Sequence, residues 1–331
     1  MKALVYKGPE LIELADVERP RRGNESVVVQ IGAVGICGSD MHAYLGHDER
    51  RPPPLILGHE AAGEIVEGPG KGRRVTINPL VSCGKCRACH EGRDNVCPDR
   101  QIMSMPPREG VFAEFATVHE RNFVELPDGL TTEQAALAEP LSCSYHGVRL
   151  ISEASFRPLA EASAVVLGGG AIGLGAALCL ADCGCSDIWI AETNKIRHRA
   201  LDAAGDFKVY DPVRSANTAP HDADVVIDAF GGPATRSAAS QLVRPGGVIL
   251  HIGLAGGDGG FDTRHATLQE ITFIGSYTYT AHDFRQCVAA MAAGRLGALD
   301  WFETRPLEDG PAAFRDINAG KVSMPKVILH P

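Results

Sequence analysis

The stretch Ala164-Val-Val-Leu-Gly168-Gly-Gly170-Ala-Ile172-Gly173 decides the fold of the second half of the chain. It is a G-x-G-x-x-G pattern placed directly after a short apolar strand and before an Ala- and Leu-rich helical stretch. Gly168 permits a tight turn, Gly170 lets the backbone approach a pyrophosphate, and Gly173 lets helix and strand pack closely. The N-terminus of the following helix supplies N–H donors for an anion. The stretch therefore predicts a dinucleotide-binding turn.

An acidic residue strengthens this prediction. Glu192 closes the next predicted strand, about 20 residues after the turn, where a ribose hydroxyl would lie. A carboxylate there accepts a hydrogen bond from a 2′-hydroxyl but repels a 2′-phosphate, which favours NAD over NADP. Lys195 and Arg197 follow closely and would partly offset the repulsion. The alternative is a Gly-rich turn beside a solvated glutamate.

Strands and helices alternate around this turn. Such a rhythm predicts βαβ units, and hence a parallel sheet with helices on its faces. The predicted strands are Ala164–Leu167, Asp187–Ala191, Asp224–Asp228, Gly247–Ile252 and Glu270–Ile274, and the predicted helices lie before Cys183 and at Asn194–Ala204 and Pro233–Val243.

The residues before about Val124 have a different character. Short β-like runs alternate there with Gly, Pro and polar residues, which is typical of a strand-rich domain with long loops. The clearest runs are Ala3–Tyr6, Ser26–Val34, Gly63–Val66 and Arg74–Asn78. Near the other end of the chain, Asp283–Ala293 is predicted to be a helix and Lys326–Leu329 a strand.

Composition narrows the class of protein. A chain of 331 residues with 44% hydrophobic and 22% charged residues is ordinary for a globular protein, and its length suggests two domains. The formal net charge of −9 argues against nucleic acid or an anionic membrane as a partner. No apolar segment of signal-peptide length opens the chain, so we expect a cytoplasmic protein. Its ten cysteines are then metal ligands or buried thiols.

Four of these cysteines form a cluster, C-x2-C-x2-C-x7-C, at Cys83, Cys86, Cys89 and Cys97. Four thiolates satisfy the tetrahedral geometry of Zn²⁺ and leave no position for a substrate, so the cluster predicts a structural zinc site. An iron–sulfur cluster is the first alternative, but the bacterial ferredoxin spacing has three residues before the last cysteine. Two disulfides are the second alternative, and they would need an oxidising compartment.

Three further segments carry candidate ligands for an open metal site. They contain Cys37, then His59 and Glu60, then Glu139. Cysteine, histidine and carboxylate together form a workable zinc set, and a catalytic zinc keeps one position for water or substrate. Each residue also has a plainer interpretation, as a buried thiol, a packed histidine or a glutamate at a helix start.

The motifs occur in a recognisable order: GICGSDMH at 35–42, LGHE at 57–60, the four cysteines, AEPLS at 138–142 and GGGAIG at 168–173. Over essentially the whole chain this order resembles the zinc-containing medium-chain dehydrogenase/reductase superfamily. The resemblance implies an α/β protein, in which a doubly wound Rossmann domain at 140–275 is inserted into a β-rich, GroES-like catalytic domain built from 1–139 and 276–331.

The resemblance also assigns roles to residues. It implies that Cys37 and His59 bind the catalytic zinc, with Glu139 where alcohol dehydrogenases of the liver type have a cysteine. Glu60 matches a glutamate that either binds this zinc or lies behind the ligands, and the choice between Glu60 and Glu139 stays open. Ser39 matches the hydroxyl that contacts the zinc-bound alcohol.

Three further matches concern proton transfer and cofactor contacts. His42 matches the end of the relay that passes the proton to solvent. Ile172 matches an apolar residue against the nicotinamide ring, and Arg197 a basic contact to the adenosine ribose.

The implied activity is hydride transfer between NAD and a secondary alcohol, with two zinc ions per chain. Glu139 and its AEPLS context look closest to the branch that oxidises polyols, aldonates or related hydroxy sugars. A simple secondary-alcohol dehydrogenase is the alternative within the enzyme class, and a non-catalytic NAD(P)H-binding relative is the alternative outside it. Relatives of this kind form homodimers or homotetramers.

Overall fold

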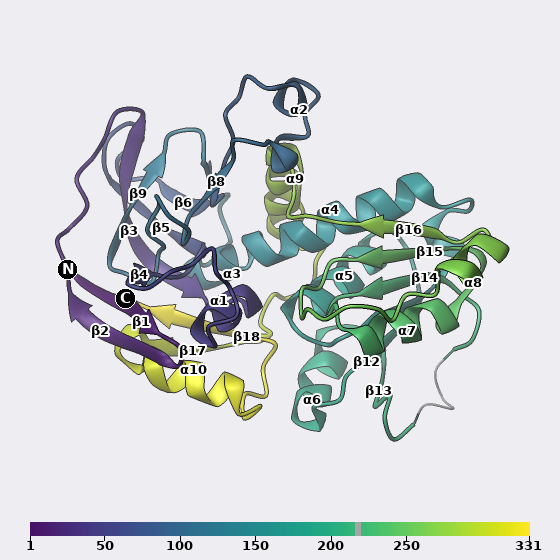
Figure 1. The fold of residues 1–331 in the computed structure, drawn as a ribbon. Helices are drawn as coiled ribbons and strands as arrows, with labels where there is room; N and C mark the ends of the chain where they lie inside the picture. Colours follow the sequence, from purple (N-terminus) through teal and green to yellow (C-terminus); the bar gives the residue numbers. More distant parts are fainter. Residues whose placement is uncertain (216–219) are drawn as a thin grey trace.

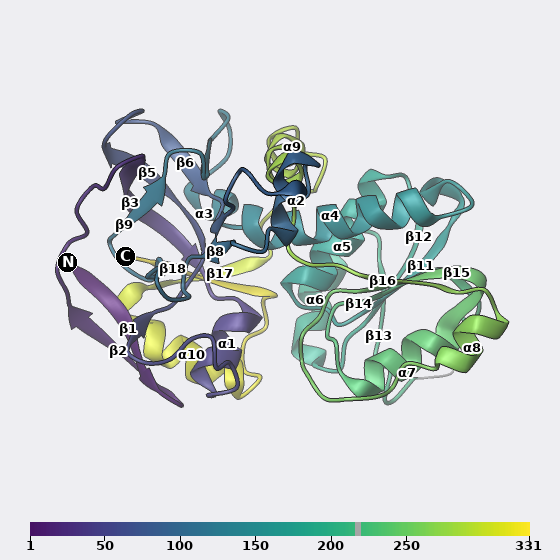
Figure 2. The same ribbon diagram turned by 45° about the horizontal axis from the view of Figure 1, so that its top comes forward.

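A computed structural model describes residues 1–215 and 220–331. Its two main β-sheets lie side by side, and a long helix runs between them (Figure 1). The N- and C-termini both lie in the part of the molecule that contains the first sheet (Figures 1 and 2).

The first main sheet has seven strands and combines both ends of the chain. Its central strand β3 (Ser26–Gly35) pairs with β5 (Glu60–Glu67) on one side and with β18 (Lys326–His330) on the other. β18 also pairs in parallel with β17 (Phe302–Pro306), whereas the other pairings are antiparallel. The sheet is completed by β6 (Arg74–Ile77), β10 (Phe123–Glu125) and β9 (Phe115–His119), the last of which pairs with β3.

Smaller elements surround this sheet. Two of them matter for the site: α1 (Gly38–Tyr44) follows β3, and a hairpin of β7 (Leu80–Val81) and β8 (Gln101–Ile102) stands at the base of the four-cysteine segment. The others are β1 (Lys2–Gly8), β2 (Leu11–Asp16), β4 (Leu55–Ile56), α2 (Arg87–His90), η1 (Asp94–Val96), α3 (Thr132–Ala136), η4 (Leu307–Asp309) and α10 (Gly310–Asn318).

The second main sheet has six parallel strands in the order β13-β12-β11-β14-β15-β16. The first of these strands in the chain lies inside the sheet, and the chain winds outward from it in both directions, which is the doubly wound Rossmann order. The fold class predicted from the sequence is therefore confirmed. The strands are β11 (Ser163–Leu167), β12 (Asp187–Ala191), β13 (Lys208–Tyr210), β14 (Ala223–Asp228), β15 (Val243–His251) and β16 (Thr272–Gly275), and the helices are α5 (Ala171–Asp182), α6 (Lys195–Ala204), α7 (Pro233–Leu242) and α8 (Thr263–Leu268).

The long helix α4 (Ala138–Ala154) was not among the predicted helices. It begins at the AEPLS motif and runs from the first sheet to the second, where it packs against α5 and against α9 (Ala281–Ala292). Because it is surrounded on several sides, even polar residues such as Ser142, Ser144 and His146 are buried. A short turn, η2 (Leu159–Glu161), follows it.

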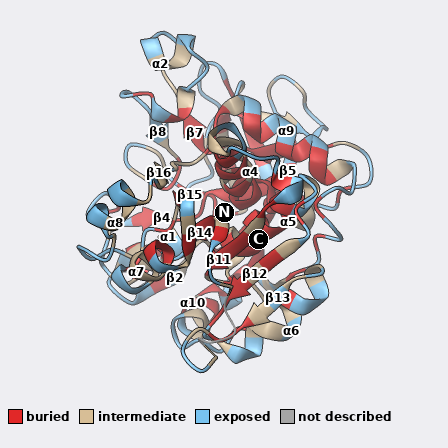
Figure 3. Ribbon diagram, turned by 90° about the vertical axis from the view of Figure 1, so that its right-hand side faces the viewer, coloured by how far each residue is buried: buried red, intermediate tan, exposed pale blue. Residues whose placement is uncertain are grey.

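Two hydrophobic cores match the two sheets. One fills the space under the seven-stranded sheet and includes the aromatic pair Phe112 and Phe314. The other packs α4, α5 and α9 against the parallel strands. Figure 3 shows α4 and the parallel strands as largely buried, whereas α2 stands out at the surface. In the described ranges no helix is both long and apolar enough to cross a bilayer.

Candidate functional site

Cys37, His59 and Glu60 come together as a candidate metal site. Their ligand atoms all lie within 4.8 Å of one another. Cys37 is the residue just before α1, His59 is the residue just before β5, and Glu60 begins β5, which pairs with the end of β3. The central pair of strands therefore brings two sequence motifs together. The trio offers sulfur, nitrogen and oxygen ligands, a set that zinc accepts.

His59 has the surroundings of a metal ligand. Its Nδ1 atom is buried, has no hydrogen-bond partner among the described residues and lies 3.4 Å from Oδ1 of the buried Asp40. Ligating histidines typically direct one ring nitrogen toward a carboxylate and the other toward the metal. Burial alone would lower the pKa of His59, but the nearby Asp40 carboxylate and Cys37 sulfur raise it well above its usual value. The pocket thus favours a positive charge at this position.

Glu60 is paired with a lysine from the far end of the chain. Lys326 Nζ donates to both carboxylate oxygens, at 2.7 and 2.6 Å, and to the backbone oxygen of Ile36 at 3.0 Å. The two side chains are 0% and 3% exposed. Gly35 leaves room for the pair, because a Cβ at this residue would lie 2.2 Å from Glu60 Oε2.

Glu139 lies in the first turn of α4 and is not part of the three-residue group. Its Oε1 atom accepts a hydrogen bond of 3.0 Å from the buried Tyr279 hydroxyl. Burial is the main cause that raises the pKa of Glu139 to about 7, and the neighbouring Glu60 adds to it. The two glutamates therefore lie in the same buried region, each with a different partner.

The two predicted relay residues lie on α1. Ser39 Oγ is 3.4 Å from His59 Nε2, so the hydroxyl faces the metal ligands. His42 lies one turn further along the helix and is partly exposed. Burial and the positive charges of His47, Arg51 and Arg50 lower the pKa of His42, although Asp48 opposes them. A neutral imidazole at the edge of the site is able to accept a proton.

The four-cysteine segment forms a compact lobe, which we define as residues 83–97. The sulfur atoms of Cys83, Cys86, Cys89 and Cys97 all lie within 4.8 Å of one another, and none forms a disulfide. Hydrogen bonding, chiefly from the Lys85 N–H, lowers the pKa of Cys83 to about 7. Four sulfurs converging in this way are the ligand set of a structural zinc site.

The predicted cofactor turn has the expected form. Gly168 has φ +106°, and α5 begins immediately after Gly170. A Cβ at Gly173 would lie 1.7 Å from the Gly168 carbonyl oxygen, so only glycine permits this contact between turn and helix. Glu192 is buried at the end of β12, where its two oxygens accept hydrogen bonds from Gly169 N at 3.1 Å and Asn194 N at 2.7 Å.

The two weaker cofactor candidates also lie beside this turn. Ile172 is in the first turn of α5, and its carbonyl accepts a hydrogen bond of 2.8 Å from Ser144 of α4. Arg197 lies near the start of α6 with Nη1 3.8 Å from Glu192 Oε2. Its Nε atom is buried without a partner among the described residues, so this N–H donor is unsatisfied.

Three important residues were not identified from the sequence. They are Asp40, which faces His59, Lys326, which holds Glu60, and Tyr279, which bonds to Glu139. Two of them could have been suspected from the sequence: Asp40 lies inside the GICGSDMH motif, and Lys326 is a single charge at the start of an apolar strand. No sequence signal marked Tyr279.

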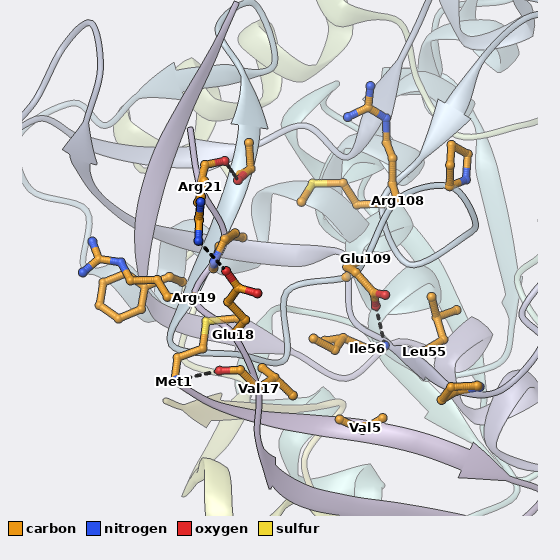
Figure 4. Close-up of a pocket in the computed structure, with 18 residues that line it drawn as sticks. Met1, Val5, Val17, Glu18, Arg19, Arg21, Leu55, Ile56, Arg108 and Glu109 are labelled. Carbon is orange, nitrogen blue, oxygen red and sulfur yellow. Dashed lines mark hydrogen bonds and ion pairs between the residues drawn. The ribbon is translucent and has the colours of Figure 1, made fainter. Parts of the chain in front are cut away.

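A separate cavity of about 590 Å³ is lined by residues of β1, β4 and β9 and of neighbouring loops (Figure 4). Its walls include Val5, Leu55 and Ile56, and Glu109 accepts a hydrogen bond from the Ile56 N–H. None of the predicted ligands, relay residues or cofactor contacts lines it. The candidate chemistry therefore lies elsewhere, at the start of α4 and β5.

Comparison with known proteins gives the family. Residues 23–128 match the alcohol dehydrogenase GroES-like domain, and residues 171–293 match the zinc-binding dehydrogenase domain. The chain is 32% identical to L-galactonate-5-dehydrogenase of Escherichia coli (strain K12), over 90% of this chain and 89% of that protein. The chain belongs to the zinc-containing medium-chain dehydrogenase/reductase superfamily. The predicted resemblance is therefore confirmed, and the protein is an oxidoreductase of this superfamily.

Two further relatives extend the comparison. The chain is 32% identical to sorbitol dehydrogenase of Bacillus subtilis (strain 168), over 77% of this chain and 75% of that protein. Among solved structures, it is similar to a putative zinc-binding dehydrogenase from Sinorhizobium meliloti 1021 bound to NADP. That similarity has a TM-score of 0.88 at 26% identity, and it covers 100% of this chain and 99% of the other.

Proposed function

We propose that this protein is a zinc-dependent, NAD-dependent dehydrogenase that oxidises a secondary alcohol group of a polyol, an aldonate or a related hydroxy sugar. The observation that carries the proposal is the convergence of Cys37, His59 and Glu60 beside Glu139, in a chain of the zinc-binding dehydrogenase family. The second zinc is assigned to the four-cysteine lobe, where it would have a structural role.

The catalytic metal would be held by Cys37 and His59, with Glu60 or Glu139 as the carboxylate ligand. A zinc ion bound there supplies Lewis acidity, which lowers the pKa of a bound hydroxyl, as it lowers that of water from 15.7 to about 7. Glu60 is paired with the Lys326 cation, whereas among the described residues Glu139 accepts a hydrogen bond only from a neutral tyrosine hydroxyl. We therefore assign Glu139 as the resting ligand, with Glu60 behind it.

The residues of the chain would move the proton and position the substrate. Ser39 Oγ, which faces His59, accepts a hydrogen bond from the substrate hydroxyl and would take up its proton while releasing its own hydroxyl proton. His42, with its lowered pKa, is neutral near pH 7 and receives that proton at the edge of the site. The Gly-rich turn would hold the pyrophosphate of the cofactor, and the bound cofactor would supply the hydride acceptor.

The cofactor is proposed to be NAD. Glu192 is buried at the end of β12, next to the turn that would hold the pyrophosphate. Its carboxylate accepts a ribose hydroxyl but repels a 2′-phosphate. The Sinorhizobium relative binds NADP, and Arg197 would be the group that tolerates a phosphate here. A kcat/KM at least about tenfold better with NADP than with NAD would reverse this choice.

The substrate class is supported by the relatives. L-Galactonate-5-dehydrogenase and sorbitol dehydrogenase act, by their names, on a sugar acid and a polyol. A simple secondary-alcohol dehydrogenase is the second candidate.

The remaining expectations are part of this proposal. Residues 1–139 and 276–331 would form the catalytic domain, and 140–275 the cofactor domain; the boundary at 139 lies inside α4. A homodimer or homotetramer is proposed because β13 and β16 are edge strands of the parallel sheet and can pair with another copy. A cytoplasmic location is proposed because four converging free thiols suit a reducing compartment.

The experiment is a screen of NAD⁺ reduction by the purified, zinc-loaded protein. Its substrates are sorbitol, xylitol, several aldonates and 2-butanol, and each is tested with NAD⁺ and with NADP⁺. We expect the highest kcat/KM with a polyhydroxy substrate and NAD⁺. Activity on every polyol and aldonate at least about a hundredfold below that on 2-butanol, a difference of about 2.7 kcal/mol, would favour the simple secondary-alcohol dehydrogenase instead.

A further inference from the structure

The four-cysteine lobe contacts the segment that connects β16 to α9. This segment, Tyr277–Ala281, is held at its start by two lobe-side residues. Asn95 Nδ2 donates to the Tyr277 carbonyl at 2.8 Å. The Arg100 guanidinium lies 4.7 Å from the centre of the Tyr277 ring, and its Nε donates to the tyrosine hydroxyl at 3.3 Å.

The lobe also holds the end of this segment. Both carboxylate oxygens of Asp94 accept a hydrogen bond from the Ala281 N–H, each at 3.2 Å, where α9 begins. Asp94 and Asn95 form part of η1, between the third and fourth cysteines. Figures 1 and 2 both place the lobe beside α9. A metal on the four sulfurs would therefore fix the turn that presents Asp94 and Asn95.

The same segment reaches the candidate catalytic site on its other side. Tyr279, which lies between the two lobe contacts, is 1% exposed, and its hydroxyl donates to Glu139 at 3.0 Å. Its neighbour Thr278 has φ +46°, a left-handed conformation that a β-branched residue rarely adopts. Such a conformation persists only where the surroundings enforce it, and here the residues before and after it are both held.

We propose that the four-cysteine lobe positions the Glu139 carboxylate through this segment, and that Asp94, Asn95, Arg100 and Tyr279 are positioning residues for the reaction. The lobe contacts fix the backbone at Tyr277 and Ala281. The Tyr279 hydroxyl then has one available position, and its hydrogen bond sets the orientation of Glu139. The inference rests on the proposed function, since it gives Glu139 a role at the catalytic metal.

A double-mutant cycle tests this coupling. Tyr279→Phe removes the hydroxyl and keeps the ring that stacks on Phe284, with centroids 5.3 Å apart. Asn95→Ala removes the lobe contact to Tyr277. We expect Tyr279→Phe to lower kcat/KM about tenfold or more, because a hydrogen bond to a buried carboxylate is lost, and Asn95→Ala to lower it about threefold or more.

The combination distinguishes a positioning role from general damage. If Asn95 acts through Tyr279, Asn95→Ala should change kcat/KM by less than about twofold in the Tyr279→Phe background. Equal effects of Asn95→Ala in both backgrounds would overturn the proposal. Glu91→Gln is the matched control, because Glu91 is exposed on the same lobe and its side chain bonds only to Arg87 among the described residues. It should leave the kinetics unchanged.

Hydrogen–deuterium exchange gives a readout that does not depend on activity. With two zinc ions retained per chain, Asn95→Ala and Arg100→Met should each speed amide exchange in residues 277–283, whereas Glu91→Gln should not. Unchanged exchange in both of the first two variants would overturn the inference, even in an active enzyme. Absence of dehydrogenase activity in the wild-type protein would instead count against the proposed function, and exchange would still decide whether the lobe holds the segment.

Discussion

Replacing Lys326 by methionine should destabilise the protein more than any surface substitution. Lys326 Nζ and the Glu60 carboxylate are 2.6 Å apart, and their side chains are 3% and 0% exposed. Methionine keeps much of the volume of the side chain but leaves a buried carboxylate without its cation. Breaking a buried pair in this way costs about 3–5 kcal/mol. The free energy of unfolding of the protein should fall by that amount.

Urea unfolding followed by circular dichroism measures this loss. For a slope of about 3 kcal/mol per molar urea, the midpoint should fall by about 1–2 M. The matched control is Lys2→Met. Lys2 makes an ion pair with Asp16 at 2.7 Å, but both side chains are more than half exposed. Because water screens such a pair, this variant should show no measurable shift in the midpoint.

A second substitution tests the assigned cause. Glu60→Gln combined with Lys326→Met removes both charges, so the double variant should be more stable than Lys326→Met alone. Two results would contradict this: Lys326→Met unfolds at the wild-type urea midpoint, or the addition of Glu60→Gln does not raise the midpoint of Lys326→Met. In either case the buried ion pair would not stabilise the protein.

Three further predictions concern the Gly-rich turn, Glu192 and the contact between α4 and α9. Gly173→Ala should raise the dissociation constant for NADH at least about tenfold in a fluorescence titration, because the new Cβ would lie 1.7 Å from the Gly168 oxygen; unchanged affinity would contradict the close packing. Glu192→Ala should reduce the preference for NAD over NADP at least about tenfold in kcat/KM, since a charged acceptor is lost; an unchanged ratio would remove Glu192 from cofactor selection. Asp283→Asn should lower stability by about 2 kcal/mol near pH 7, because His146, Arg149 and Thr280 donate to the buried carboxylate. Although burial raises the pKa of Asp283, these donors hold it well below its usual value. The stability that the Asp283 carboxylate contributes is therefore fully present above about pH 4 and is lost as the pH falls further. A stability difference between wild type and Asp283→Asn that grows in acid would contradict this pH dependence.

Much of the fold could be predicted because it follows local rules. The strands of the parallel sheet are short apolar runs separated by helical stretches, and each predicted strand overlaps an observed one. The missed helix α4 shows the limit of such rules. Its sequence begins with Ala-Glu-Pro and contains three serines, and its buried polar residues hide the periodicity that marks an amphipathic helix.

Only the residues of the candidate site that lie in short sequence motifs could be predicted. Cys37, His59 and Glu60 lie in two short segments, and the pairing of β3 with β5 brings them together. The partners of the glutamates come from remote parts of the chain. Lys326 and Glu60 are 266 positions apart, and Tyr279 and Glu139 are 140 positions apart. No local pattern links such pairs, because their contact depends on the packing of the whole fold.

The most direct test of the catalytic metal site is the zinc content of the wild-type protein and of Cys37→Ser, measured together with turnover of a polyhydroxy substrate. We expect two zinc ions per wild-type chain with NADH formation. For Cys37→Ser we expect one zinc ion per chain, with turnover lost and NADH binding retained. A single zinc ion in the wild-type chain, or wild-type turnover in Cys37→Ser, would contradict the assignment of the catalytic metal site.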